Sequence, residues 1–202
     1  MKSSPQHESW QVLNSREIYR AKPWIALSLQ QVRLPDGTLV DDYHCVEMPA
    51  YAVIFAETED GQVIVERQYK HGLRKVSLTL PAGLVEPGED TLAAAQRELL
   101  EETGYEAPAW RHLGSFVPNS NYGCGQAHLY AASGALRVAE PEAGDLEEIE
   151  VLLLSPDELL QALQAGEIGA ASMALAVALA THPRCSPPPA PLEKTGETAK
   201  TP

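Results

Sequence analysis

The sequence predicts an α/β domain built in layers and preceded by a small antiparallel β module. Three observations support this fold class. A long helical pattern covers residues 90–103, β-rich apolar runs lie on both sides of it, and a second, alanine-rich helical pattern closes the folded region at 168–182. Strands that surround a helix in this way are typical of a sheet with helices packed on its faces. The residues alone leave the order of the strands open.

The first folded segment, residues 10–48, has the pattern of a small antiparallel β module. Residues 24–34 are strand-like, Leu-Pro-Asp-Gly at 34–37 favours a hairpin turn, and 39–48 is a returning strand. A meander of this size has little surface to bury alone, so we expect it to pack on the main domain or on another copy of itself. The polar residues 1–9 in front of it are expected to be disordered.

We place the main domain at residues 49–182. Its first two strands flank a Glu-Asp-Gly turn and should form a hairpin. The third strand alternates in hydrophobicity and is then interrupted by Pro81-Ala82-Gly83. The strands expected in this domain cover 51–57, 62–69, 76–80, 110–117, 127–132 and 148–154.

The predicted helices have identifiable ends. Gly104 suits the C-terminal stop of the helix at 90–103. A second helix begins at the capping box Ser-Pro-Asp-Glu at 155–158, with proline at its first position, and ends at Gly166. From 183 to 202 the chain is proline-rich and then polar, which is typical of a disordered tail.

The composition excludes several classes of partner. A net charge of −13 repels nucleic-acid backbones and anionic membranes, so we expect neither as a partner. Cys45, Cys124 and Cys185 are too widely spaced for a metal-ligand pair or a disulfide framework, which favours a reducing cytoplasm. The N-terminus lacks an apolar signal segment, and the longest apolar run, 170–180, is too short to span a bilayer. We therefore expect a cytoplasmic protein that binds phosphates only with the help of cations.

One stretch, residues 83–105, has the side chains for such chemistry. On a helix, the spacing of Glu98, Glu101 and Glu102 puts three carboxylates on one face, one turn apart. These charges repel one another unless a cation lies among them. Oxygen ligands with no Cys or His nearby favour Mg²⁺ or Mn²⁺. Such ions bridge phosphate oxygens and lower the pKa of an attacking water.

The same stretch resembles the Nudix box, G-x5-E-x7-R-E-U-x-E-E-x-G-U, in which U is a bulky apolar residue. Every glycine and charged position is matched, and Tyr105 departs because an aliphatic residue is usual there. The resemblance implies the Nudix fold, a mixed β-sheet sandwiched between α-helices, with the box as a strand, a loop and a helix. It also implies hydrolysis of the diphosphate bond in a nucleoside diphosphate linked to another moiety.

The resemblance implies a metal site at the box. Glu98 and Glu102 would hold a metal ion together with the backbone carbonyl of Ala82. Glu101 would be an additional ligand with a part in catalysis. Mg²⁺ is the expected ion, with Mn²⁺ as a substitute.

Two further box positions have supporting roles in the family. Gly83 would let the loop turn sharply beside the Ala82 carbonyl, where the substrate also binds. Arg97 would pair with carboxylates such as Glu89 and hold their orientation during catalysis.

Residues outside the box narrow the resemblance to the ADP-ribose pyrophosphatase group. Those that carry it are Pro-Ala-Gly at 81–83, Val-Glu-Arg-Gln-Tyr at 65–69 and the β module at 10–48. In that group the module exchanges between subunits, so the resemblance implies a homodimer. It also implies ADP-ribose as the substrate, with AMP and ribose 5-phosphate as products.

Two more site residues follow from this resemblance. The acidic stretch Gly-Asp-Leu-Glu-Glu-Ile-Glu-Val at 144–151 is similar to the loop that supplies the general base. We predict Glu147 as that base, with Asp145 and Glu148 as alternatives. Arg67 is predicted to bind a substrate phosphate, because its forked guanidinium suits that geometry.

The sequence departs from the group at positions that bear on specificity. Thr79 stands where the group usually has Glu, Lys70 replaces a frequent Arg, and the loop 118–126 ends in Gln126 where an acidic residue is common. Two alternatives therefore stay open. One is hydrolysis of GDP-mannose or another nucleotide sugar or dinucleotide, and the other is a non-hydrolytic nucleotide-binding module on the same fold.

Overall fold

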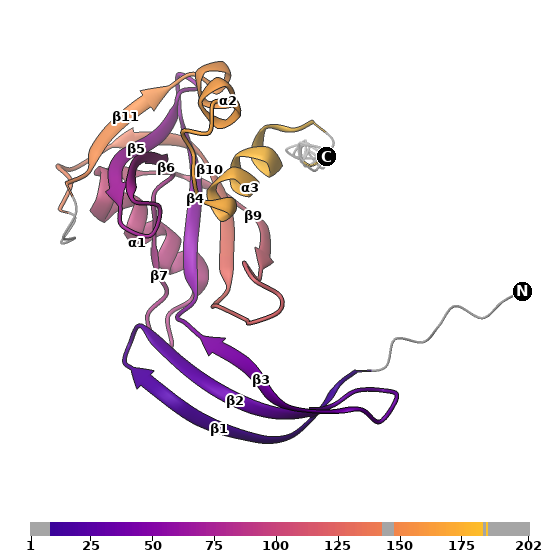
Figure 1. Cartoon of the computed structure of the whole chain (residues 1–202). Helices are drawn as coiled ribbons and strands as arrows, with labels where there is room; N and C mark the ends of the chain where they lie inside the picture. Colours follow the sequence, from indigo (N-terminus) through magenta and orange to yellow (C-terminus); the bar gives the residue numbers. More distant parts are fainter. Residues whose placement is uncertain (1–8, 143–147, 184, 186–202) are drawn as a thin grey trace, which may run out of the picture.

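The chain folds around two separate β-sheets (Figure 1). The computed structural model describes residues 9–142, 148–183 and 185. The smaller sheet is N-terminal, antiparallel and ordered β1-β2-β3, with β1 at Gln11–Ala21, β2 at Ile25–Arg33 and β3 at Leu39–Glu47. We call this sheet the N-terminal module. It forms a curved layer that extends away from the rest of the molecule (Figure 1).

The larger sheet is mixed, because its central strands β4 and β10 are parallel while the other pairs are antiparallel. Its order is β11-β5-β4-β10-β8, with β6 beside β5, β7 beside β4 and β9 beside β10. A mixed sheet between helices was predicted, and the prediction is confirmed. The strands are β4 (Tyr51–Thr58), β5 (Val63–Lys70), β6 (Lys75–Thr79), β7 (Ala82–Leu84), β8 (Tyr105–Glu106), β9 (Ala109–Phe116), β10 (Ala127–Arg137) and β11 (Glu150–Leu154).

Strand β4 forms the centre of two hydrophobic layers. Side chains of a strand alternate between the faces of its sheet. Val53 and Phe55 therefore pack toward helices α2 (Pro156–Gln164) and α3 (Ala171–Thr181). Ala52 and Ile54 pack on the opposite face, against helix α1 (Thr91–Thr103). This arrangement fixes α1, and the carboxylates along it, against the middle of the sheet.

Both ends of α1 are capped, and its C-terminal cap is the Gly104 that the sequence indicated. The Asp90 side chain accepts hydrogen bonds from the N–H groups of Leu92 and Ala93 at 3.0 and 3.2 Å. Gly104 ends the helix in the left-handed region, with φ of 76°, and donates its N–H to the Leu100 carbonyl at 2.8 Å. A non-glycine residue pays a steric cost in that region. The capping box predicted at 155–158 is also present at the start of α2.

The N-terminal module contacts the main domain mostly through its last strand. Backbone hydrogen bonds join Val46 to the loop 118–126, including one from the Cys124 N–H to the Val46 carbonyl at 3.0 Å. The Tyr43 hydroxyl donates to the Asn121 carbonyl at 2.5 Å. Strand β1, by contrast, is exposed along almost its whole length. The module therefore leaves a broad β surface open to solvent.

Several boundaries differ from the predictions. Pro81-Ala82-Gly83 was expected only to interrupt a strand, but the chain turns after Pro81 and re-enters the sheet as β7, paired with β4. Helix α3 begins at Ala171 instead of 168, because residues 167–169 run beside β6, where the Leu78 N–H donates to the Glu167 carbonyl. No helix among the described residues is long and apolar enough to cross a membrane. Most of the predicted disordered ends, 1–9 and 183–202, lies outside the described residues.

Candidate active site

Gly83 and Glu98 bring strand β7 and helix α1 into direct contact. A Cβ atom added at Gly83 would lie 2.0 Å from the Cδ of Glu98, so the Glu98 carboxylate occupies the space that a side chain at position 83 would fill. The backbone of Gly83 lies in an ordinary strand conformation, paired with Ala52. The expected reason for this glycine, a sharp turn, is therefore wrong. Close approach of a carboxylate requires the glycine.

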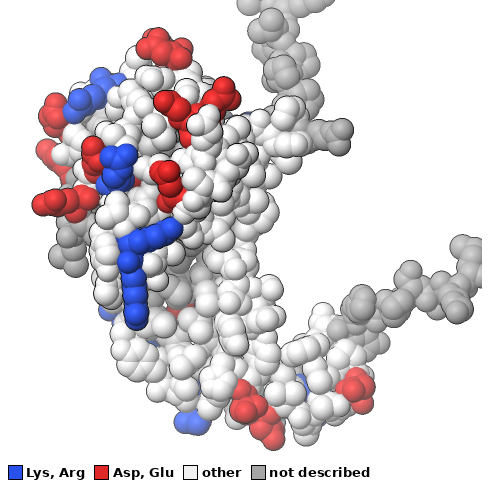
Figure 2. Space-filling view, turned by 45° about the horizontal axis from the view of Figure 1, so that its top comes forward, with Lys and Arg blue, Asp and Glu red and all other residues white. Residues whose placement is uncertain are grey.

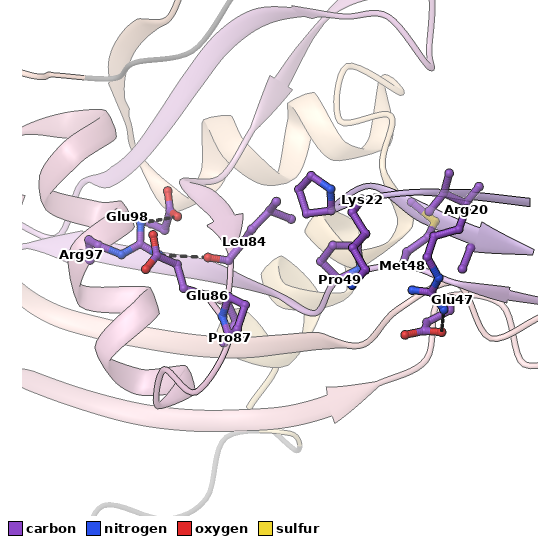
Figure 3. Close-up of a pocket in the computed structure, with 14 residues that line it drawn as sticks. Arg20, Lys22, Glu47, Met48, Pro49, Leu84, Glu86, Pro87, Arg97 and Glu98 are labelled. Atoms are coloured by element: carbon purple, nitrogen blue, oxygen red, sulfur yellow. Dashed lines mark hydrogen bonds and ion pairs between the residues drawn. The ribbon is translucent and has the colours of Figure 1, made fainter.

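Arg97 connects the carboxylates on the outer side of this contact, and Figure 3 shows it beside Glu98 and Leu84. Its Nε and Nη2 donate to the two carboxylate oxygens of Glu89, each at 3.0 Å. Its Nη1 donates to Glu98 at 2.6 Å and to Glu101 at 3.1 Å. Nη2 also donates to the Leu84 carbonyl at 2.9 Å. One guanidinium therefore fixes the loop before α1 relative to the middle of the helix.

These bonds perturb the titration of both partners. The hydrogen bonds from Arg97 are the largest cause that lowers the pKa of Glu89. The same bonds, those with Glu89 first, raise the pKa of Arg97 above its already high ordinary value. Both groups therefore stay charged at neutral pH.

Glu102 lies deeper than Glu98, against the start of β7. Its side chain accepts a hydrogen bond from the Ala82 N–H at 2.7 Å, and the residue is only 5% exposed. Burial is the main cause that raises the pKa of this carboxyl well above its usual range, and the charge of Glu66 is the second. A buried carboxyl in such a position gains from either a proton or a cation.

Glu66 was not singled out from the sequence, yet the structure places it behind Glu102. It is wholly buried on β5, and its carboxyl group forms a hydrogen bond with that of Glu102. Two buried neighbours, Gln68 and Thr79, also contact it. One signal in the sequence could have indicated it: a glutamate directly follows the apolar run Val63-Ile64-Val65.

Glu101 has a different environment from the other two helix carboxylates. Its side chain is half exposed and pairs with Arg97, whereas Glu98 and Glu102 face the sheet and are largely buried. The predicted shared face of three carboxylates is thus present, but its members differ in burial. Glu102 lies one helical turn after Glu98, and both side chains are on the buried side of α1.

The inner donors fit a hard divalent cation. Two carboxylates, those of Glu98 and Glu102, lie one helical turn apart beside the backbone of Ala82, and Gly83 leaves room for one of them. Carboxylate and carbonyl oxygens are the ligands that Mg²⁺ and Mn²⁺ prefer. Among the described residues, no three His, Cys, Asp or Glu side chains form a metal-binding group by themselves. The expected donor set also includes the backbone carbonyl of Ala82.

The remaining predicted residues lie around the edge of the sheet formed by β5 and β11. The Arg67 Nη1 donates to Glu150 at 2.8 Å, and both side chains are about half exposed. Alternation along β5 puts Arg67 on the opposite face from Glu66. Arg67 and Glu148 also line a surface cavity of about 570 Å³. The predicted base Glu147 and its alternative Asp145 lie outside the described residues.

A cavity of about 480 Å³ connects this site with the N-terminal module (Figure 3). Arg97, Glu98 and Leu84 line its inner end, while Arg20 and Lys22 line it from the module. Figure 3 shows these two groups of side chains on opposite sides of the space, with the chain around Pro49 between them. Sequence reasoning missed this cavity, because Arg20 and Lys22 precede Leu84 by more than sixty positions in numbering.

Charge is distributed unevenly over the surface. In Figure 2, Asp and Glu side chains gather over the end of the molecule that carries α2 and β11, with a few Lys and Arg among them. Large uncharged areas lie over the rest of this face. The net charge of the chain is −13, which disfavours the approach of an anion. Arg20 and Lys22 add positive charge to the lining of the cavity next to Glu98.

Comparison with known protein families matches almost the whole described chain. A family model described as NUDIX domain matches residues 47–175. A second model, described as nucleoside diphosphate sugar hydrolase N-terminal domain, matches residues 10–46.

Individual relatives agree with these matches. A methanol dehydrogenase activator from Bacillus methanolicus is 31% identical, over 76% of this chain and 83% of the relative. An ADP-ribose pyrophosphatase from Mycobacterium tuberculosis is 32% identical, over 83% of this chain and 81% of the relative. Among solved structures, an ADP compounds hydrolase superposes with a TM-score of 0.75 at 19% identity, covering 86% of this chain and 93% of the other. This last likeness concerns the fold.

Proposed function

The chain belongs to the Nudix family, and we propose that it hydrolyses ADP-ribose to AMP and ribose 5-phosphate in the presence of Mg²⁺. The observation that carries this proposal is the pair of buried carboxylates, Glu98 and Glu102, held beside Ala82 and Gly83. Such a pair is costly to bury without a cation. A cation there matches diphosphate hydrolysis, which needs positive charge next to phosphate oxygens.

The residues beside this pair have defined tasks in the proposal. Glu98, Glu102 and the Ala82 carbonyl hold the metal ion, and Glu101 is an additional ligand from the solvent side. When bound, the ion supplies polarisation of the diphosphate and a lowered pKa for the attacking water. Mn²⁺ should replace Mg²⁺, since both prefer oxygen ligands.

Arg97 and Gly83 keep the carboxylates in place. Arg97 orients Glu98 through its 2.6 Å hydrogen bond while its other nitrogens are fixed by Glu89. Gly83 provides the space for the Glu98 carboxylate, and its backbone is a proposed contact of the substrate. Neither residue needs to exchange a proton.

Glu147 is the proposed general base, with Asp145 and Glu148 as alternatives, and Arg67 is the proposed phosphate ligand. Support for Arg67 comes from its place in a cavity that Glu148 also lines. To bind a phosphate, the Arg67 guanidinium must release Glu150 and pair with the phosphate instead. This costs little free energy, because exposed ion pairs are weak.

The balanced reaction is attack of water on one phosphorus of the diphosphate. The P–O bond to the bridging oxygen breaks, and the water oxygen stays on the attacked phosphorus. AMP and ribose 5-phosphate leave with the released protons in solution. The cavity of about 480 Å³ next to Glu98 has the volume to hold part of such a substrate.

A homodimer through the N-terminal module is part of the proposal. Trp10, Val12, Tyr19 and Trp24 of the module are each more than half exposed. Large apolar side chains left exposed on one small module are typical of an interface. We also place the protein in the cytoplasm, where its three free cysteines would stay reduced.

A substrate panel tests this proposal. Purified protein is incubated with Mg²⁺ and ADP-ribose, GDP-mannose, other nucleotide sugars or dinucleotides, and the released monophosphate is measured by chromatography. We expect the highest kcat/KM with ADP-ribose. Absence of a monophosphate product from every compound would overturn the proposal. Tight calorimetric binding of ADP-ribose without turnover would instead favour a non-hydrolytic binding module.

Nucleoside diphosphate sugars other than ADP-ribose, GDP-mannose among them, are the second candidate substrates. The observation that favours them is the match of residues 10–46 to a domain model named for nucleoside diphosphate sugar hydrolases. The diphosphate chemistry at Glu98 and Glu102 would be the same. The panel separates the two candidates by their relative kcat/KM.

A further inference from the structure

Glu66 and Thr79 are direct cross-strand partners in the antiparallel pair formed by β5 and β6. Glu66 is wholly buried, and Thr79 is 3% exposed. Side chains opposite each other in such a pair have Cβ atoms about 4.5–5.5 Å apart. A carboxylate from either position therefore reaches nearly the same volume of the protein interior.

Two side-chain hydrogen bonds hold Oε2 of the Glu66 carboxyl group in this volume. The Gln68 Nε2 donates to Glu66 Oε2 at 2.8 Å and to Thr79 Oγ1 at 2.9 Å, which uses both of its protons. The Thr79 hydroxyl then donates to the same Glu66 oxygen at 3.4 Å. The Glu66 carboxyl is also hydrogen-bonded to Glu102, which accepts from the Ala82 N–H at 2.7 Å. These contacts form a continuous path from β6 to the expected metal ligands.

A purely structural role explains this cluster poorly. The three residues before Glu66 on β5 are Val63, Ile64 and Val65, and all of them are fully buried. An apolar side chain would therefore also suit the buried position 66. Burying a carboxyl group beside a second one costs free energy that an aliphatic residue would not. Such a cluster is retained where it serves a site.

We propose that Glu66 is a positioning residue that supplies, from β5, the carboxylate that sequences of the ADP-ribose pyrophosphatase group usually place at position 79 on β6. Thr79, the departure from that group noted in the sequence, leaves the space and provides a hydroxyl donor for the relocated carboxylate. Glu66 in turn orients Glu102 and Ala82 toward the metal ion. This inference rests on the proposed function, because it assigns Glu66 to the same metal site.

An exchange of the two residues tests the proposal. Mn²⁺ affinity without substrate is measured by electron paramagnetic resonance for the wild type, Glu66→Thr, and the double variant Glu66→Thr with Thr79→Glu. The single change should weaken Mn²⁺ binding by about 10- to 100-fold, as loss of an orienting partner does. The double variant should regain affinity to within about 3-fold of the wild type, because its carboxylate returns to the same volume from the opposite strand.

Two controls keep the outcome clear. Circular dichroism checks that each variant is folded, and Glu59→Gln, in the exposed turn after β4, should leave the affinity unchanged. Should the double variant not fold, the isosteric Glu66→Gln takes its place, with an expected loss of about 10-fold. Wild-type affinity in folded Glu66→Thr or Glu66→Gln, or a folded double variant no better than the single one, overturns the proposal.

A further variant separates this inference from the proposed function. Glu102→Gln removes an expected metal ligand itself. If Glu102→Gln binds Mn²⁺ like the wild type, the metal site of the proposed function is wrong. If Glu102→Gln loses Mn²⁺ while both Glu66 variants keep it, only the role of Glu66 is wrong.

Discussion

Gly83 and Glu98 are packed so closely that only a glycine fits opposite this carboxylate, since a Cβ at position 83 would lie 2.0 Å from the Glu98 Cδ. The contact joins the short strand β7 to the middle of helix α1. It therefore fixes the side chain that the proposed chemistry depends on most.

Gly83→Ala should displace the Glu98 carboxylate. We expect a loss of activity of about 100-fold, because a displacement of about 1 Å has that effect on a catalytic geometry. Overpacking should also lower the free energy of unfolding by about 1–3 kcal/mol. Steady-state kinetics and urea unfolding measure the two effects. Gly72→Ala is the matched control, since a Cβ at Gly72 meets no atom within 4 Å. Equal behaviour of the two variants would contradict this explanation of Gly83.

Arg97→Lys should weaken the outer network, because lysine cannot reproduce the two parallel hydrogen bonds to Glu89. The expected decrease in the free energy of unfolding is about 1–3 kcal/mol, with a fall in kcat as Glu98 loses its orientation. Arg137→Lys changes an exposed pair with Glu140 and should alter stability by less than about 0.5 kcal/mol. Chemical unfolding measures the free energy of unfolding of both variants. A larger decrease for Arg137→Lys than for Arg97→Lys would contradict the stabilising role of the Arg97 network.

The raised pKa of Glu102 predicts a pH dependence of stability in the metal-free protein. The folded state binds the Glu102 proton more tightly than the unfolded state, so this contribution is fully present below the ordinary pKa near 4.5 and is lost as pH rises toward the raised value. From about pH 5 upward, stability should fall by as much as about 1.4 kcal/mol per pH unit from this group.

The measurement is urea unfolding in a chelator across this pH range, for the wild type and Glu102→Gln. The amide of the variant does not titrate in this pH range. The difference between the two curves of stability against pH therefore reports the titration of the Glu102 carboxyl alone. Parallel curves would show that Glu102 is ordinary in the folded state. Added Mn²⁺ should restore the stability of the wild type at high pH.

The exposed N-terminal module predicts self-association. Tyr19 on β1 is 57% exposed, and Trp24 follows it in the turn at 63%. Tyr19→Asp should move the protein from dimer toward monomer in sedimentation velocity, because a charge in a dimer interface is desolvated without a partner. A wild type that sediments as a monomer at all concentrations would rule out the proposed dimer.

The sequence predicted the helices well because their ends are local features. Gly104 and the Ser155–Glu158 capping box act over one turn, so each can be recognised without knowing the fold. The mixed sheet came from the family resemblance. The periodicity of the strands says which residues are buried but not which strands are neighbours.

Glu66 was missed for a physical reason of the same kind. Its importance depends on the register that sets it opposite Thr79 and on the packing of α1 that brings Glu102 to it. Neither is visible in the run Val63-Ile64-Val65-Glu66. The reason given for Gly83 failed similarly, because a glycine required by a tight contact looks the same in a sequence as one required by a turn.

The most direct test of the proposed function compares the wild type with Glu98→Gln in the hydrolysis of ADP-ribose with Mg²⁺. The variant keeps the shape of the side chain and its space beside Gly83, but it loses the charge that holds the cation. We predict release of AMP and ribose 5-phosphate by the wild type and a rate at least about 100-fold lower for the folded variant. A Glu98→Gln protein that releases AMP at the wild-type rate would contradict the metal site on which the proposal depends.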